Sequence, residues 1–139
     1  MKRFAMASAL LLLLTGCETA DVGPSQAELK AQWDAQNVMP QNYKQDLLAF
    51  LRTYLNDPSH VRDAAVSQPV LKTVGPGQRY IACVRYNARN SDGKYAGEKT
   101  GAAIYVSGKL DQFLDGPRTK ELCTDAVYAP FPELQKLQR

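Results

Sequence analysis

The sequence has one histidine, one tryptophan and three cysteines, and these low counts exclude several kinds of chemistry. With His60 as the single histidine, no His/Cys cluster has the spacing of a zinc site, so we expect no metal and no cofactor. No two cysteines form the Cys-x-x-Cys spacing of a redox motif. Gly75-Pro76-Gly77 lacks the further spaced glycine and the following helix of a phosphate-binding loop.

Catalytic sets are also missing. His60 directly follows the helix-stopping segment Asp57-Pro58-Ser59, where a lone histidine is usually structural or exposed, and no Ser-His-Asp set is convincing. Asp111 and Asp115 are four residues apart on an expected strand, which separates them by about 13 Å. That distance is too large for the paired carboxylates of a glycosidase. We therefore predict that the protein is not an enzyme.

The longest apolar run, residues 4–14, is about half the roughly 20 residues needed to span a membrane. It follows Lys2-Arg3 and ends in small residues, which is the plan of a secretory signal peptide. The segment Leu14-Thr15-Gly16-Cys17 resembles a bacterial lipobox. The resemblance implies cleavage after residue 16, a diacylglycerol on Cys17 and usually an N-acyl chain, and two or more chains anchor stably. A soluble signal peptide cut elsewhere is the alternative.

Glu18 follows the cysteine, whereas an aspartate at this position of a lipoprotein often means inner-membrane retention. We therefore expect the cell envelope, at the outer membrane facing the periplasm. Removing residues 1–16 takes away two cations and leaves 15 lysines and arginines against 14 acids, which argues against a nucleic-acid partner. Cys83 and Cys123 would then be the remaining thiols, and in an oxidising periplasm they predict a disulfide. Closing that loop would stabilise the fold by roughly 4 kcal/mol.

The patterning predicts three parts: a signal peptide at 1–16, a lipidated flexible tether at 17–41 and a small α+β domain at 42–139. Within the tether, Leu29 and Trp33 share one face of a short helical pattern. Trp33 either anchors in the membrane interface or packs on the domain. The strongest helix is residues 43–55, where positions 47, 48, 51, 54 and 55 form one apolar stripe.

The rest of the domain is expected to be mainly strands. Pro69 interrupts an extended stretch at 59–74. Residues 79–87 alternate as a strand, with Tyr80, Ala82, Val84 and Tyr86 on one face and Ile81, Cys83 and Arg85 on the other. Ser107-Gly108 is a two-residue hairpin turn, and residues 119–125 predict a short helix. Prolines at 130 and 132 indicate an unpaired tail before a frayed final turn. The predicted fold is α+β: one main helix on an antiparallel sheet of three to four strands, with a short C-terminal helix and one disulfide.

Asp57-Pro58-Ser59 and the run from Cys83 through Asn87-Ala88-Arg89-Asn90-Ser91 to Gly97 resemble segments of small, alphaproteobacterial-type exported lipoproteins of unknown function. The resemblance carries no activity over. The loop Asn87–Gly97 is the best candidate binding surface because loops on a rigid sheet often carry function. Its candidate residues are Asn87, Arg89, Asn90, Ser91, Lys94 and Tyr95. The alternative is that the loop only connects two strands.

We expect a lipid-anchored interaction or scaffold module that binds the membrane through Cys17 and an envelope or peptidoglycan-associated partner. The alternative is an inhibitor of a cell-wall hydrolase, because Ser91-Asp92-Gly93-Lys94-Tyr95 is similar to the loop that lysozyme-inhibiting lipoproteins present. The Trp-x-Lys-Gly element expected downstream is absent, and the nearest segment is Tyr105-Val106-Ser107-Gly108-Lys109.

Overall fold

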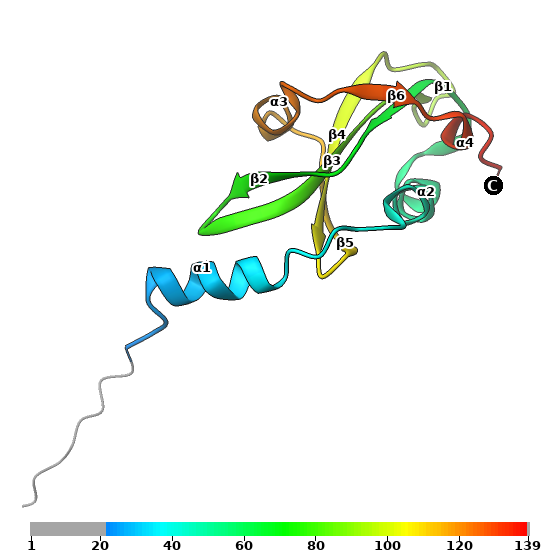
Figure 1. The fold of residues 1–139 in the computed structure, drawn as a ribbon. Helices are drawn as coiled ribbons and strands as arrows, with labels where there is room; N and C mark the ends of the chain where they lie inside the picture. Colours follow the sequence, from blue (N-terminus) through cyan, green and yellow to red (C-terminus); the bar gives the residue numbers. More distant parts are fainter. Residues whose placement is uncertain (1–21, 139) are drawn as a thin grey trace, which may run out of the picture.

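A computed structural model describes residues 22–138, which form an α+β fold with an antiparallel sheet (Figure 1). The predicted signal peptide, the lipobox and Cys17 lie outside these residues. The elements are α1 (Gln26–Ala35), α2 (Tyr43–Tyr54), β1 (Asp57–Ser67), β2 (Val70–Val74), β3 (Gly77–Arg89), β4 (Lys99–Val106), β5 (Lys109–Leu114), α3 (Arg118–Cys123), β6 (Tyr128–Pro130) and α4 (Pro132–Gln135). The α+β class is confirmed, but the described residues form six strands and four helices, more than the predicted one main helix on three to four strands.

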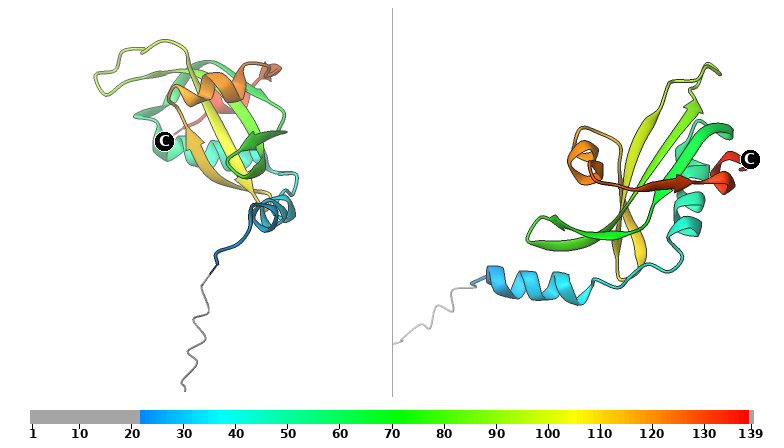
Figure 2. Two further views of the ribbon diagram at one scale, coloured as in Figure 1. Left: turned by 90° about the vertical axis from the view of Figure 1, so that its left-hand side faces the viewer. Right: turned by 45° about the horizontal axis from the view of Figure 1, so that its top comes forward.

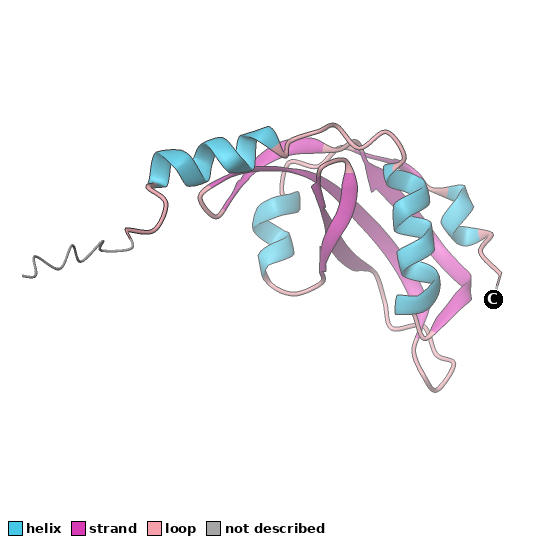
Figure 3. Cartoon of the chain, turned by 90° about the horizontal axis from the view of Figure 1, so that it is seen from below, coloured by secondary structure: helices cyan, strands magenta, loops and turns pink. Residues whose placement is uncertain are grey.

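β3 is the central strand of the sheet, whose order is β5-β4-β3-β1-β6, and β2 pairs with β3 in addition. Its side chains alternate as predicted: Ala82 and Val84 are buried on one face, and Ile81 and Cys83 are buried on the other. Both faces are buried because helices cover both. α2 and α4 lie on one side of the sheet and α3 lies on the other (Figures 1 and 3).

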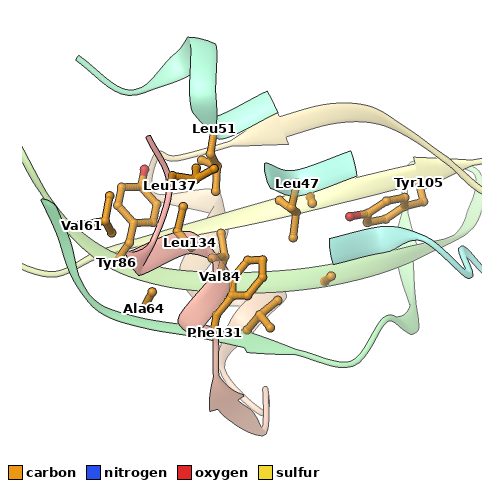
Figure 4. Close-up of a cluster of buried hydrophobic side chains, with 13 residues drawn as sticks. Leu47, Leu51, Val61, Ala64, Val84, Tyr86, Tyr105, Phe131, Leu134 and Leu137 are labelled. Atoms are coloured by element: carbon orange, nitrogen blue, oxygen red, sulfur yellow. The ribbon is translucent and has the colours of Figure 1, made fainter. Parts of the chain in front are cut away.

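The larger core lies between the sheet and α2 (Figure 4). Leu47 and Leu51, from the predicted stripe of α2, are fully buried there. Tyr105 of β4 is 1% exposed, and its hydroxyl donates a 3.0 Å hydrogen bond to the main-chain oxygen of Tyr43. This bond satisfies a polar group that would otherwise be costly to bury.

The C-terminal tail corrects a prediction. β6 pairs with β1 through Ala65↔Pro130 and two further pairs, although two prolines were expected to prevent regular pairing. The reason is position: β6 ends the strand order, and a proline is tolerated on an edge strand because its missing N–H can face away from the ladder. The tail continues into the core, where Phe131 and Leu134 are fully buried.

The smaller core lies on the α3 side and contains the predicted disulfide. Cys83 of β3 forms a disulfide with Cys123 at the end of α3, 40 positions later in the sequence. Ile81, Ala102 and Ile104 are buried in the same cluster as the two cysteines. The disulfide therefore fixes α3 to the centre of the sheet.

α1 differs from the predicted flexible tether, because residues 26–40 fold onto the sheet. The Arg79 guanidinium lies 3.8 Å from the centre of the Trp33 ring and donates to the main-chain oxygen of Trp33 at 2.7 Å. Its second nitrogen donates to Gln36 Oε1 at 2.8 Å. Gly77 makes this approach possible, since a Cβ there would lie 2.9 Å from the Cβ of Trp33. Of the two alternatives for Trp33, the structure shows packing on the domain.

Candidate functional site

The candidate loop Asn87–Gly97 extends beyond the body of the fold. Figure 2 shows it as the yellow-green segment between β3 and β4 that projects away from the sheet. Asn87 and Arg89 belong to the end of β3, and residues 90–93 turn the chain back. Ser91, Asp92 and Lys94 are exposed, whereas Tyr95 is half-buried. The loop therefore offers a polar, exposed tip, while its base lines a hollow of about 250 Å³ through Arg89, Asn90 and Ala96.

Two asparagines fix the shape of this tip. The main-chain N–H of Asn90 donates to the oxygen of Lys94 at 2.8 Å, and Asn90 Oδ1 accepts from the N–H of Lys94 at 3.0 Å. Asn87 Oδ1 accepts from the N–H of Gly97 at 3.1 Å. These side-chain oxygens are used within the loop, so Asn87 and Asn90 shape the surface. Ser91 and Lys94 are the predicted residues that face solvent.

Tyr95 ties the loop to the neighbouring strand. Its hydroxyl donates a 2.8 Å hydrogen bond to the main-chain oxygen of His60 in β1. The Arg62 guanidinium lies 3.9 Å from the centre of the Tyr95 ring, and that of Arg89 lies 5.3 Å away. Stacking of a cation on an aromatic face stabilises by about 0.5–1 kcal/mol at exposed sites. The loop is therefore held from two directions and has a defined position.

The part of β1 that receives Tyr95 is irregular, which the sequence analysis did not predict. The β1–β3 register shifts between Asp57 and Arg62 and again between Arg62 and Ala65. His60 and Asp63 have φ angles of 64° and 54°, a left-handed conformation that is uncommon for residues other than glycine. Such backbone strain concentrates at functional positions. The irregular segment and the loop tip form one continuous surface, which we call the tip surface: His60, Arg62, Ser91, Lys94 and Tyr95.

Asp57 lies beside the tip surface, next to His60 and Arg89. Its Oδ1 accepts from the N–H of Ser59 at 3.1 Å and from the Ser59 hydroxyl at 2.6 Å, and this hydroxyl bond is the main reason why the pKa of Asp57 is lowered. Oδ2 lies 3.8 Å from His60 Nδ1 and 3.9 Å from Arg89 Nη1. Asp57 is therefore ionised at neutral pH and pairs with the base of the loop.

The tip presents hydrogen-bonding and charged groups to solvent, among them Ser91, Asp92 and Lys94. Within residues 22–138, no group of three or more histidine, cysteine, aspartate or glutamate side chains is placed to hold a metal ion. Over the same residues, no helix has the length and apolar character needed to cross a membrane. Asp111 and Asp115 lie on and just beyond β5, away from His60.

A second feature, missed by the sequence analysis, is a groove of about 420 Å³ between β2 and the segment Asp125–Ala129. The end of β1 contributes Val66 and Ser67 to its lining, Gln68 follows directly after β1, and the start of α2 contributes Tyr43 and Lys44. Val70, Leu71 and Val127 are exposed beside it. The signal in the sequence was two adjacent apolar residues, Val70 and Leu71, directly after Pro69. Because they do not alternate with polar residues, the pattern alone could not assign them to a core or to the surface.

No protein-family model, no curated protein and no solved structure matches this chain.

Proposed function

We propose that this protein is a lipid-anchored module of the bacterial envelope that binds another protein through its tip surface. The observation that carries the proposal is the fixed projection of the loop: Tyr95 is bonded to His60 and stacked by Arg62, while Lys94 and Ser91 remain exposed. A preorganised loop loses less conformational entropy on binding than a mobile one, which favours affinity.

The charge of the tip surface suggests the character of the partner. Arg62 and Lys94 are exposed, and neither forms an ion pair within residues 22–138; Asp63 and Asp92 are exposed beside them, so the tip carries charges of both signs. An acidic patch on the partner would be complementary to these cations and would accelerate association. Charge reversal at Lys94 therefore tests the proposal without touching the core.

The membrane anchor in this proposal is the lipid on Cys17. Its support is the lipobox-like segment Leu14-Thr15-Gly16-Cys17 after a short apolar run. Metabolic labelling with a palmitate analogue should mark the full chain and should not mark Cys17→Ser, which should also accumulate as precursor. Normal processing of Cys17→Ser would remove the anchor from the proposal.

A second candidate function is inhibition of a cell-wall hydrolase. The projection of Ser91-Asp92-Gly93-Lys94 favours it, because an exposed lysine on a protruding loop can enter a cleft that contains paired carboxylates. Inhibition would use a tyrosine beside the loop to contact the enzyme, but the Tyr95 hydroxyl already donates a hydrogen bond to the main-chain oxygen of His60. Inhibition of a lysozyme by the full chain at micromolar concentration, lost in Lys94→Glu, would support this candidate, and absence of inhibition would remove it.

The binding proposal is tested by crosslinking in intact cells. The full chain and Lys94→Glu are compared with Lys109→Glu, which reverses an exposed lysine beside another hairpin. We expect a discrete crosslinked partner for the unchanged chain and for Lys109→Glu, with at least tenfold less for Lys94→Glu. Equal recovery for all three chains would contradict the tip surface as the binding face.

A further inference from the structure

The groove beside β2 is the second surface of the fold with the properties of a binding site, and it lies apart from the tip surface. It gathers three of the seven large apolar side chains that are exposed among residues 22–138. Val70, Leu71 and Val127 are 45%, 42% and 84% exposed. Exposed apolar side chains that gather in one place, rather than singly, mark interaction sites.

β2 supplies an open sheet edge to this groove. It pairs with β3 from Val70↔Ile81 to Val74↔Gly77, and the described residues place no strand on its other side. The two-residue turn after Val74 makes Val74↔Gly77 a hydrogen-bonded pair, and antiparallel pairs alternate. The N–H and C=O groups of Leu71 and Thr73 therefore point away from β3 at the open edge of the sheet, and Leu71 also lines the groove. An edge of this kind is a template for a further strand.

The charges around the groove favour an acidic occupant. Lys72 forms an ion pair with Asp125 across the two walls, so these two charges are satisfied. Lys44 lies 5.8 Å from the centre of the Phe131 ring and forms no ion pair within residues 22–138. The lining therefore keeps one uncompensated positive charge, near β6, and this charge complements a carboxylate.

We propose that the groove binds an extended segment of another protein, which adds a strand to the edge of β2 and places apolar side chains against Val70, Leu71 and Val127. Main-chain hydrogen bonds to Leu71 and Thr73 hold the segment, and an acidic residue of the segment pairs with Lys44. This is recognition by strand addition, in which the backbone supplies affinity and alternate side chains supply specificity.

The second wall of the groove selects this occupant over a second copy of the chain. Segment Asp125–Ala129 faces β2 across the groove, and the Lys72–Asp125 pair holds the two walls together. A single peptide strand without flanking structure fits such a slot. Pairing of the β2 edges of two copies would have to accommodate the Asp125–Ala129 wall of both, whereas a peptide brings no wall of its own.

The proposal is tested with the full chain in detergent and a fluorescent octapeptide that alternates valine with serine and ends in two glutamates. Val127→Glu is compared with Val22→Glu, because the two valines are 84% and 86% exposed and neither substitution disturbs a core. We expect saturable binding that weakens at least tenfold in Val127→Glu and less than twofold in Val22→Glu. Hydrogen exchange of residues 70–74 should slow when the peptide binds.

Two altered peptides make the test specific. Proline at alternate positions should abolish binding because it removes the donors needed for strand pairing, and lysine in place of the two glutamates should weaken binding at least fivefold.

The proposal is overturned by equal binding of the proline peptide, by no binding at millimolar peptide, or by hydrogen exchange that slows only outside residues 70–74. Concentration-dependent protection of residues 70–74 without peptide would also overturn it, since that result assigns the groove to a second copy. Lys94→Glu should leave peptide binding unchanged, so failure here and failure of the tip surface are separate results.

Discussion

The Tyr95 hydroxyl donates a 2.8 Å hydrogen bond to the main-chain oxygen of His60, and this bond joins the projecting loop to the most irregular part of the sheet. His60 is one of three residues other than glycine with a positive φ among residues 22–138. The acceptor is therefore presented by an uncommon backbone conformation. The loop and the irregular strand depend on each other for their positions.

Replacing Tyr95 with phenylalanine should loosen the loop without unfolding the protein. The change removes the bond to His60 and keeps the ring under Arg62, so we expect a loss of about 1 kcal/mol or less and faster hydrogen exchange at residues 90–97. Tyr128→Phe is the matched control. Arg85 stacks at 4.0 Å on that ring, as Arg62 does at 3.9 Å on the ring of Tyr95. Similar exchange in both variants would contradict the role given to the hydroxyl.

The C-terminal segment should be essential for stability. Leu134 is fully buried in the larger core, so Leu134→Ala should lower the free energy of unfolding by about 2–5 kcal/mol. Glu133→Ala, an exposed change on the same short helix, should cost less than about 0.5 kcal/mol. Urea unfolding of the full chain measures both values. A small cost at Leu134 would mean that α4 does not pack as described.

The central strand β3 could be predicted from the sequence pattern, whereas the C-terminal tail could not. Alternation of side chains correctly assigned residues to the two faces of β3, and both faces are buried. The disulfide was predicted because only Cys83 and Cys123 would remain after lipidation of Cys17. The tail was missed because a three-residue strand such as β6 is too short to show a period, and its pairing with β1 spans more than 60 residues of sequence. Its prolines were read as barriers, although an edge strand tolerates them.

The sequence predicted the loop of the tip surface but not the contacts that hold it. Asparagine and glycine content located the loop, but the pairing of Tyr95 with His60 joins residues 35 positions apart. The register shifts of β1 cannot be read from an apolar pattern, because a bulge moves side chains between faces without changing composition. Composition likewise indicated a flexible tether for residues that the Arg79–Trp33 contact folds onto the sheet.

That contact gives a further prediction. Trp33→Ala should release α1, because Trp33 packs against Gly77 and under the Arg79 guanidinium. We expect limited proteolysis to cut residues 26–41 at least tenfold faster, while the melting temperature of the rest changes little. Gln32→Ala, an exposed change on the same helix, should be cut at the original rate. Unchanged protection in Trp33→Ala would show that other contacts hold α1.

The pH dependence of stability should include a contribution from Tyr54. Partial burial, together with the hydrogen bond to Asp115 and its negative charge, raises the pKa of Tyr54 to about 12, above its value of about 10 in an unfolded chain. The folded state holds this proton more tightly, so the contribution is fully present below pH 10 and is lost as the pH rises from about 10 to about 12. Ultraviolet titration should lose one late phenol in Tyr54→Phe, and Asp115→Asn should bring that phenol to lower pH. A titration unchanged in both variants would contradict the assignment.

The central claim is that the protein binds a partner through its projecting tip, and site-specific photocrosslinking in intact cells tests it most directly. A photoreactive residue is placed at Ser91 in one chain and at Lys109 in another, both exposed, so that Lys94 keeps its charge. The account predicts a discrete crosslinked species from position 91, absent from position 109 and reduced at least tenfold when Tyr95→Ala is added. A species formed equally from both positions, or from position 109 alone, would contradict it.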